Sequence, residues 1–208
     1  MTDARLDHLL YAVPDLLVGV AEFAERTGVR PAAGGSHPGG TANYLVSLGP
    51  TAYLEIIGPD PGADQETRQR AAELELLDVP RLAGWAVHPD DIVEAVRKAR
   101  AHGYDPGDVA PMSRRTPDGR LLEWRLTRWD EPALVDPVPF LIDWGDTPHP
   151  AASGLPCVRL LSLTATHPQP AALLAKLAAL GVELDVEPGP EIVMRAELDT
   201  PRGVVTLS

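Results

Sequence analysis

Two ionisable side chains lie in stretches of sequence that otherwise look buried. His8 stands in LDHLLYAVPDL, residues 6–16, which predicts an apolar strand followed by a helix, and alternation along that strand places His8 among leucines. Glu55 stands in AYLEIIGPD, on the same strand face as Tyr53 and Ile57. A buried imidazole or carboxylate is tolerated when a metal ion, a ligand or a mutual hydrogen bond compensates for its burial. We therefore expect His8 and Glu55 to face each other in one concavity.

Three similar units along the chain would position these side chains. Each unit has a short apolar strand, a proline in the first turn of an amphipathic helix, and a glycine placed as the C-terminal cap of that helix. The prolines are Pro14, Pro89 and Pro168, and the glycines are Gly28, Gly103 and Gly181. Candidate strands follow each helix, so the pattern predicts three βαβββ units.

These units predict one α+β body whose repeated βαβββ modules form a cupped, mostly antiparallel sheet. Module 1 spans about residues 4–60, and module 2 spans about residues 80–147. A charged, helix-prone segment of about residues 62–79 connects them. A truncated third module, of about residues 156–208, follows a crossover rich in proline and glycine.

Composition limits the classes of function. The chain has 208 residues, a hydrophobic fraction of 44% and a net charge of −12, which is typical of a globular protein and opposes binding to nucleic acid or to an anionic membrane. No apolar run approaches the roughly 20 residues of a membrane span. The first residues lack a signal-peptide pattern, so we expect a cytoplasmic protein. A single cysteine, Cys157, excludes an internal disulfide and a cysteine-cluster metal site. We expect a small-molecule partner and a monomer or homodimer.

The order of these motifs resembles the vicinal oxygen chelate superfamily, and more closely its glyoxalase-like branch. The similarity rests on LDHLLYAVPDL, GGSHPGGTANYLVSLG and AYLEIIGPD in the first module, and on PFLIDWGDTPHP and SLTATHP later in the chain. It covers nearly the whole chain and implies the fold shared by glyoxalase I, bleomycin-resistance proteins and extradiol dioxygenases. The superfamily includes lyases, epimerases, oxygenases and non-catalytic binders, and the fold alone does not choose among them.

The resemblance also implies a place for a metal ion. In the superfamily, each of two modules supplies one ligand from its first strand and one from its last, which in module 1 are His8 and Glu55. Module 2 departs from this pattern, because apolar residues stand at both matching positions. A divalent ion (Zn, Fe, Mn or Ni) would need further ligands, and the candidates are His37, in GGSHPGG, and His149, in DTPHP. Two histidines and one carboxylate leave open coordination positions, as in catalytic metal sites.

Each candidate also has a plain structural interpretation. Glu55 and His37 are the candidate catalytic residues, but Glu55 would also be tolerated as an edge carboxylate and His37 as a solvent-facing turn residue. His8 would be satisfied as a core histidine bonded to Glu55 without a metal. Asn43 and Trp144 are the candidates for substrate binding; the alternatives are that Asn43 holds the backbone of its loop and that Trp144 belongs to the core.

Two functions are compatible with these residues and motifs. The favoured one is a metal-dependent enzyme of the lyase, isomerase or dioxygenase type that acts on a small oxygenated molecule. The alternative is a metal-free protein that binds or sequesters a small molecule in the same cup, as resistance proteins of this fold do. Clustering of His8, His37 and Glu55 favours the enzyme, whereas the degraded second module favours the binder. Arg114 and Arg115 precede a turn motif, and we interpret them as a solvated hairpin tip.

Overall fold

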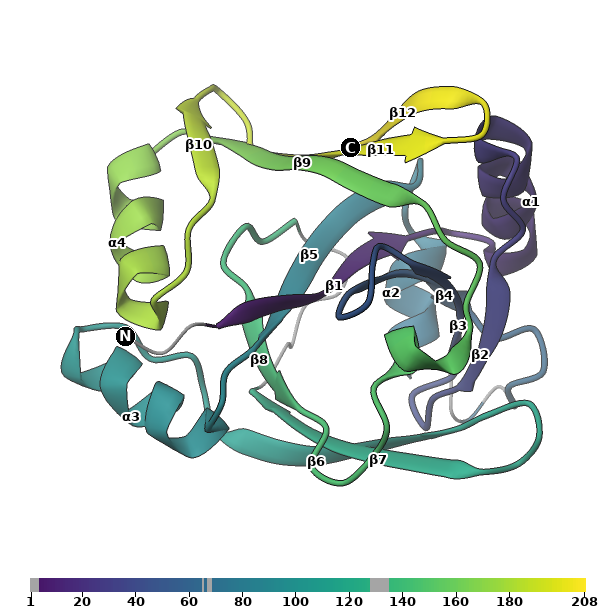
Figure 1. The fold of residues 1–208 in the computed structure, drawn as a ribbon, viewed down its shortest axis with the longest axis horizontal. Coiled ribbons are helices and arrows are strands. Elements are labelled where there is room, and N and C mark those ends of the chain that lie inside the picture. The colour runs from purple at the N-terminus through teal and green to yellow at the C-terminus, as the bar shows by residue number, and fades with distance from the viewer. Residues whose placement is uncertain (1–3, 65, 67–68, 128–134) are drawn as a thin grey trace.

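The computed structural model describes residues 4–64, 66, 69–127 and 135–208. Within these residues, eight strands close into a barrel in the order β1-β4-β3-β2-β6-β7-β8-β5. A second sheet of four strands, in the order β10-β9-β11-β12, lies along one side of the barrel (Figure 1). The chain therefore has an α+β fold with a curled, mostly antiparallel sheet, which confirms the expected fold class.

The elements follow the predicted order of strand, helix and three strands. The first unit contains β1 (Arg5–Ala12), α1 (Leu16–Thr27), β2 (Ala32–Ser36), β3 (Thr41–Ser47) and β4 (Tyr53–Pro59). After the connecting helix α2 (Gln69–Glu75), the second unit contains β5 (Arg81–His88), α3 (Ile92–Ala101), β6 (Val109–Arg115), β7 (Leu121–Thr127) and β8 (Phe140–Asp143). A short 3-10 helix (Pro150–Ser153) leads to β9 (Arg159–His167), α4 (Pro170–Leu180), β10 (Asp185–Pro188), β11 (Val193–Thr200) and β12 (Gly203–Leu207).

The first two units share one strand order, and the third departs from it. In each of the first two, the first strand pairs in parallel with the last, β1 with β4 and β5 with β8. The barrel is joined where β1 runs antiparallel to β5, and it closes where Ser36 of β2 pairs with Arg115 of β6. In the third unit, β9 lies between β10 and β11. The four strands of this unit form a separate sheet that lies beside the barrel and does not extend it.

Local sequence explains where the helices begin and end. Asp15 and Asp91 cap α1 and α3 by accepting backbone N–H groups of the first turn, and Gly28 ends α1 in the left-handed conformation. The helix α3 ends at His102, one residue before the glycine expected there. The prolines at positions 14, 89 and 168 lie before the N-caps, outside the first turn in which we expected them. Among the described helices, Pro170 of α4 and Pro150 of the short 3-10 helix occupy such a first-turn position.

Both faces of the first barrel strands are buried. Leu9 and Leu54 point outward into a core shared with the helices and the second sheet, whereas Leu10 and Tyr53 point into the barrel. The connecting helix contributes its buried Leu74, and the residue Leu77 that follows the helix joins it in a small cluster at one end of the barrel. The barrel interior thus contains a separate set of side chains, and the candidate site lies among them.

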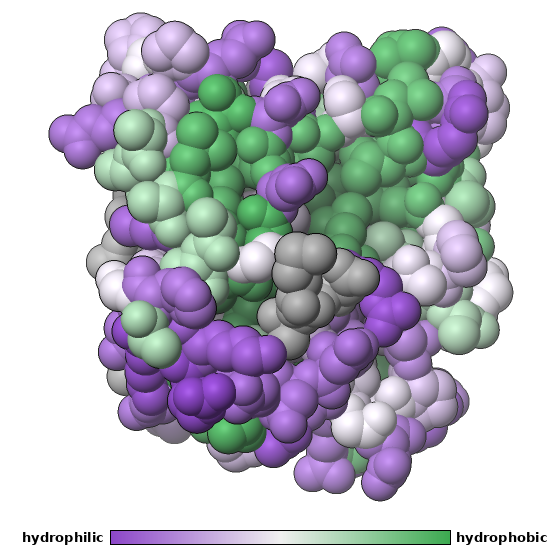
Figure 2. Space-filling model, turned by 60° about the vertical axis from the view of Figure 1, so that its left-hand side comes forward, coloured by the Kyte–Doolittle hydropathy of each residue, from purple (hydrophilic) through white to green (hydrophobic). Residues whose placement is uncertain are grey.

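The molecular surface divides by element. Figure 2 shows hydrophobic side chains gathered over the upper part of one face, where the second sheet and α4 lie, and hydrophilic ones over the lower part, where α3 lies. None of the helices in the described ranges is long and apolar enough to cross a membrane. The cytoplasmic location stays a prediction.

Candidate functional site

A β-bulge in β1 places two ionisable side chains side by side. Leu6 pairs with Val87 of β5 and His8 pairs with Ala86, so Asp7 is an extra residue in the ladder. Such a bulge redirects a side chain that strict alternation would send to the other face. Asp7 is only 1% exposed and His8 only 3% exposed, so the bulge buries both side chains.

His8 is held on several sides. Its Nδ1 lies 2.7 Å from Oδ1 of Asp7, and its ring stacks on Tyr53 with centroids 4.7 Å apart. Phe140 meets the ring edge-on. Nε2 of His8, the nitrogen on the opposite side of the ring, lies 3.5 Å from Oε2 of Glu55. The predicted meeting of an imidazole and a carboxylate is therefore present in the structure.

Glu55 lies at the centre of a cluster with His8 and His37. It lies on β4, and its Oε1 accepts a 2.6 Å hydrogen bond from the Nδ2 of Asn43 on the neighbouring β3. Nε2 of His37 lies 3.8 Å from the same Oε1, and Nδ1 of His37 lies 3.2 Å from the Thr41 hydroxyl. The glycine-rich turn between β2 and β3 positions His37, through a 2.8 Å bond from its N–H to the Thr41 carbonyl.

The hydrogen-bond roles around His8 favour a proton or a metal ion between His8 and Glu55. Burial alone would raise the pKa of Asp7, but hydrogen bonds to His149 and His8 outweigh it and hold the pKa well below its ordinary value. Asp7 is therefore ionised and accepts the Nδ1 proton of His8. In a neutral ring the lone pair of Nε2 then faces the Glu55 carboxylate, which places two acceptors opposite each other. A proton or a metal ion between them removes this conflict.

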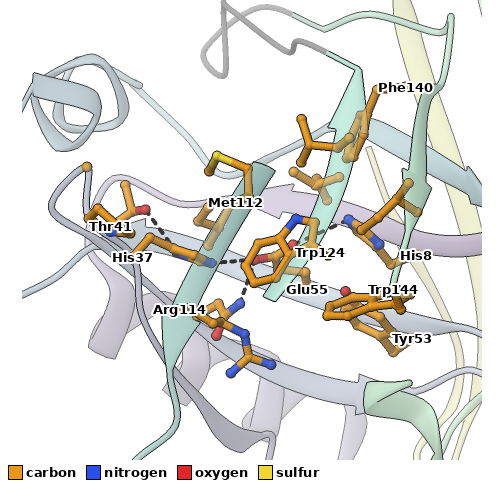
Figure 3. Close-up of a pocket in the computed structure, with 17 residues that line it drawn as sticks. His8, His37, Thr41, Tyr53, Glu55, Met112, Arg114, Trp124, Phe140 and Trp144 are labelled. Atoms are coloured by element: carbon orange, nitrogen blue, oxygen red, sulfur yellow. Dashed lines mark hydrogen bonds and ion pairs between the residues drawn. The ribbon is translucent and has the colours of Figure 1, made fainter. Parts of the chain in front are cut away.

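These polar groups form one wall of a cavity inside the barrel. The cavity has a volume of about 290 Å³. Module 1 supplies His8, His37, Asn43, Tyr53 and Glu55, while module 2 supplies mainly apolar side chains, among them Met112, Trp124, Phe140 and Trp144 (Figure 3). A polar wall opposite an apolar wall is the usual design of a small-molecule site.

The family model for the glyoxalase-like domain matches residues 6–181. The chain belongs to this family. It is thereby a member of the vicinal oxygen chelate superfamily, as the order of its motifs indicated. No curated protein matches the sequence.

Solved structures are similar to this glyoxalase-like chain at low sequence identity. A hypothetical protein from Staphylococcus aureus is 15% identical, with a TM-score of 0.63, over 98% of this chain and 84% of that one. A mutant 4-hydroxymandelate synthase from Streptomyces coelicolor is 16% identical, with a TM-score of 0.51, over 100% of this chain and 63% of that one. Methylmalonyl-CoA epimerase from Mycobacterium tuberculosis is 18% identical, with a TM-score of 0.43, over 68% and 88%. At these identities the likeness concerns the fold alone.

The residues of the cluster match a metal site in chemical type. Two imidazoles and one carboxylate are a common donor set for divalent ions, and each imidazole has its far nitrogen beside an outer partner, Asp7 or Thr41. Among the described residues, however, no group of three or more His, Cys, Asp or Glu side chains stands in the arrangement of a finished metal site. Nε2 of His8 and Nε2 of His37 lie 3.5 and 3.8 Å from different oxygens of Glu55, so the side chains would have to adjust for all three residues to share one ion.

His149 does not join this cluster, contrary to its place in the expected ligand set. Its Nδ1 accepts the N–H of Ala151, so a neutral ring carries its proton on Nε2, which lies 3.1 Å from Oδ2 of Asp7. The crossover thus holds His149 behind Asp7, where its ring also lies beside Tyr53, with ring centroids 5.6 Å apart. Trp144 lines the cavity and also donates its Nε1–H to Asp7 at 3.1 Å. It therefore forms part of the cavity wall and helps to hold the Asp7 carboxylate in place.

Two residues were misjudged or missed from sequence. Arg114 is 4% exposed and lines the cavity, so its interpretation as part of a solvated hairpin tip is wrong; the neighbouring Arg115 is exposed. Alternation along β6 turns Met112 and Arg114 inward, a pattern that the sequence contained. Asp7 was not among the candidates, because regular alternation sends it away from the His8 face. Only its position next to a candidate histidine pointed to it.

Proposed function

We propose that this glyoxalase-like protein is a metal-dependent enzyme of the lyase, isomerase or dioxygenase type, which acts on a small oxygenated molecule in the barrel cavity. His8, His37 and Glu55 would hold the divalent ion. The observation that carries the proposal is the position of His8 Nε2, 3.5 Å from the Glu55 carboxylate inside the cavity, an arrangement that a bound cation would stabilise. When bound, such an ion polarises a carbonyl or hydroxyl oxygen of the substrate.

The chain's own residues would prepare this chemistry. Asp7 fixes the orientation and the tautomer of His8, and Asn43 fixes the carboxylate of Glu55. The aromatic and aliphatic wall from module 2 excludes water, which strengthens electrostatic interactions inside the cavity.

Elemental analysis of the protein purified without added metal tests the proposal. We expect stoichiometric divalent metal in the parent and its loss in His8→Ala and Glu55→Ala. His149→Ala should retain the metal more fully than these two variants, because His149 contacts Asp7 and not the cluster. His102→Ala, at the exposed end of α3, is the matched control. Absence of metal from the parent, together with failure of Zn, Fe, Mn or Ni to bind on addition, would overturn the proposal.

A second candidate function is metal-free binding or sequestration of a small molecule. It is supported by the lack, among the residues described, of a finished metal-binding group and by the wholly apolar contribution of module 2 at the positions matching His8 and Glu55. In that case the parent carries no stoichiometric metal, and a ligand that binds the cavity does so equally in the presence of a chelator.

A further inference from the structure

A buried arginine is the main positive charge that the described residues present to the cavity. Arg114 lies on β6, across the barrel from the strands that carry the cluster, and it lines the same cavity as Glu55 and Trp124. Figure 3 shows it among the side chains of the site. Burial is the main influence on Arg114 and lowers its pKa, and the nearby Glu55 carboxylate partly opposes this shift. A guanidinium remains charged at any physiological pH, so its burial places a fixed cation at the cavity wall.

The protein satisfies this cation only in part. The described hydrogen bond of Arg114 runs from Nη1 to the backbone carbonyl of Gly34, which is a neutral acceptor. Among the residues that the structure describes, no carboxylate lies within ion-pair distance of it, and the Glu55 oxygens face Asn43, His8 and His37. A guanidinium has five N–H donors in a planar fork that matches a carboxylate. A buried charge with this little compensation favours a ligand that supplies the opposite charge.

Gly35 of the neighbouring strand β2 leaves the space that the Arg114 guanidinium occupies. A β-carbon on Gly35 would lie 3.2 Å from Nη1 of Arg114 and 1.9 Å from the carbonyl oxygen of Arg115, and the φ of Gly35 is +139°. Only glycine adopts that backbone at this spacing. The segment that carries His37 therefore also leaves room for the guanidinium, so one loop serves the cluster and the arginine.

We propose that Arg114 selects the ligand of this cavity as a small organic monoanion, a carboxylate with an apolar or aromatic body. The body would fill the space between Trp124, Phe140 and Trp144, and the carboxylate would meet the guanidinium. A dianion is disfavoured, because Glu55 lies in the same cavity. Since the whole chain carries a net charge of −12, preference for an anion must come from this local cation. The inference rests on the proposed function only in assigning this cavity as the site.

Binding of a matched pair of probes, phenylacetate and the uncharged phenylacetamide, tests the inference. Trp124 and Trp144 line the cavity, so tryptophan fluorescence reports occupancy. We expect the parent to bind phenylacetate about tenfold or more tightly than phenylacetamide, since a charge-assisted bond distinguishes them. Arg114→Gln should reduce this ratio to about one without weakening phenylacetamide, and Arg114→Lys should retain part of it. Arg115→Gln, on the exposed neighbour, should leave the ratio unchanged.

Several outcomes would overturn the inference. They are equal binding of the two probes to the parent, no binding of phenylacetate at millimolar concentration, an unchanged ratio in Arg114→Gln, and tighter binding of phenyl phosphate than of phenylacetate. If Arg114→Gln does not fold, the parent and Arg114→Lys ratios decide. Metal analysis is independent of these measurements. A parent that retains the metal but does not prefer phenylacetate contradicts this inference alone. A parent that lacks the metal but prefers phenylacetate contradicts the proposed function alone.

Discussion

At the scale of single residues, Asp7 joins parts of the chain that are far apart in sequence. Its carboxylate meets His8 on the same strand, Trp144 after β8 and His149 in the crossover. These three hydrogen-bond contacts, with Nδ1 of His88 a further 3.9 Å neighbour, compensate the buried carboxylate for the loss of its hydration. Asp7 therefore sets the position of His8 relative to Glu55 and connects the polar wall of the cavity to its apolar wall.

Substitution of Asp7 by Asn should destabilise the fold and loosen the site. An amide accepts through one oxygen only, so one of the present donors would face an N–H instead. We expect the free energy of unfolding to fall by about 2–4 kcal/mol at pH 7. We also expect metal affinity at the proposed site to fall roughly 10–100-fold. Chemical denaturation and metal titration measure these effects, with Asp90→Asn, an exposed partner of Arg5, as the control.

The difference in stability between the parent and Asp7→Asn should depend on pH, because the pKa of Asp7 is depressed. Burial alone would raise that pKa. The hydrogen bonds to His149 and His8 have the larger combined effect, so the pKa is lowered overall. A depressed folded-state pKa gives stability that is present above the unfolded pKa of about 3.9 and is lost as the pH falls toward the folded value. In chelator-treated protein, the stability gap between parent and Asp7→Asn should therefore narrow between pH 5 and pH 2. A gap that stays constant or widens would contradict the assigned role.

At the scale of elements, the edge between β2 and β3 controls the carboxylate of the cluster. Asn43 of β3 bonds Glu55, and its amide oxygen lies over Gly34 of β2, where a β-carbon would stand only 2.1 Å from it. Gly34 is thus required by close approach and not by its backbone angles. The bulge in β1 and this close approach are two local irregularities that bring His8 and Glu55 to opposite sides of one gap.

Gly34→Ala should displace Asn43 and release Glu55. Since displacement of the buried amide breaks its 2.6 Å hydrogen bond to Glu55, we expect a loss of about 1–3 kcal/mol in the free energy of unfolding. Weaker metal retention should accompany it. Gly62→Ala is the control, because this loop glycine has ordinary backbone angles and a β-carbon there would meet only ordinary contacts. Equal behaviour of the two variants in thermal unfolding and metal analysis would contradict the role of Gly34.

At the scale of the whole molecule, the third unit packs against the barrel through its strands and its helix. Contacts join β11 to β5, β12 to α1, and α4 to α3. Met194 and Leu198 of β11 are fully buried in the same core as Leu9 and Leu54 of the barrel. The outer side of the unit instead exposes hydrophobic residues such as Leu161 and Val204. Shared burial makes the barrel and the second sheet one cooperative body.

Leu198→Ala tests this cooperation, because the substitution lies in the second sheet while all four tryptophans belong to the second module. Removing a fully buried leucine should lower the free energy of unfolding by about 2–5 kcal/mol. We expect the transition followed by tryptophan fluorescence to shift with it as a single step. Leu161→Ala, on the exposed side of β9, should change stability by less than about 0.5 kcal/mol. An unchanged fluorescence transition in Leu198→Ala would show two independently folding bodies.

The sequence by itself determined the order of elements and the central pair of the site. Hydrophobic periodicity, helix caps and turn residues are local properties, so they predicted the repeated βαβββ order and the strands that carry His8 and Glu55. A histidine and a glutamate within apolar strands are costly unless they meet, so their meeting was also predictable. The family followed from the same motifs.

Only the tertiary structure decided which further groups complete the site. The bulge at Asp7 is fixed by pairing with β5, a strand more than seventy residues away, and regular alternation contains no trace of it. Closure of the barrel turned Arg114 from an expected surface residue into a cavity residue, and the path of the crossover placed His149 behind Asp7. Periodicity reports which face of a strand is buried. Which side chains share a cavity depends on register and closure, which are long-range properties of the fold.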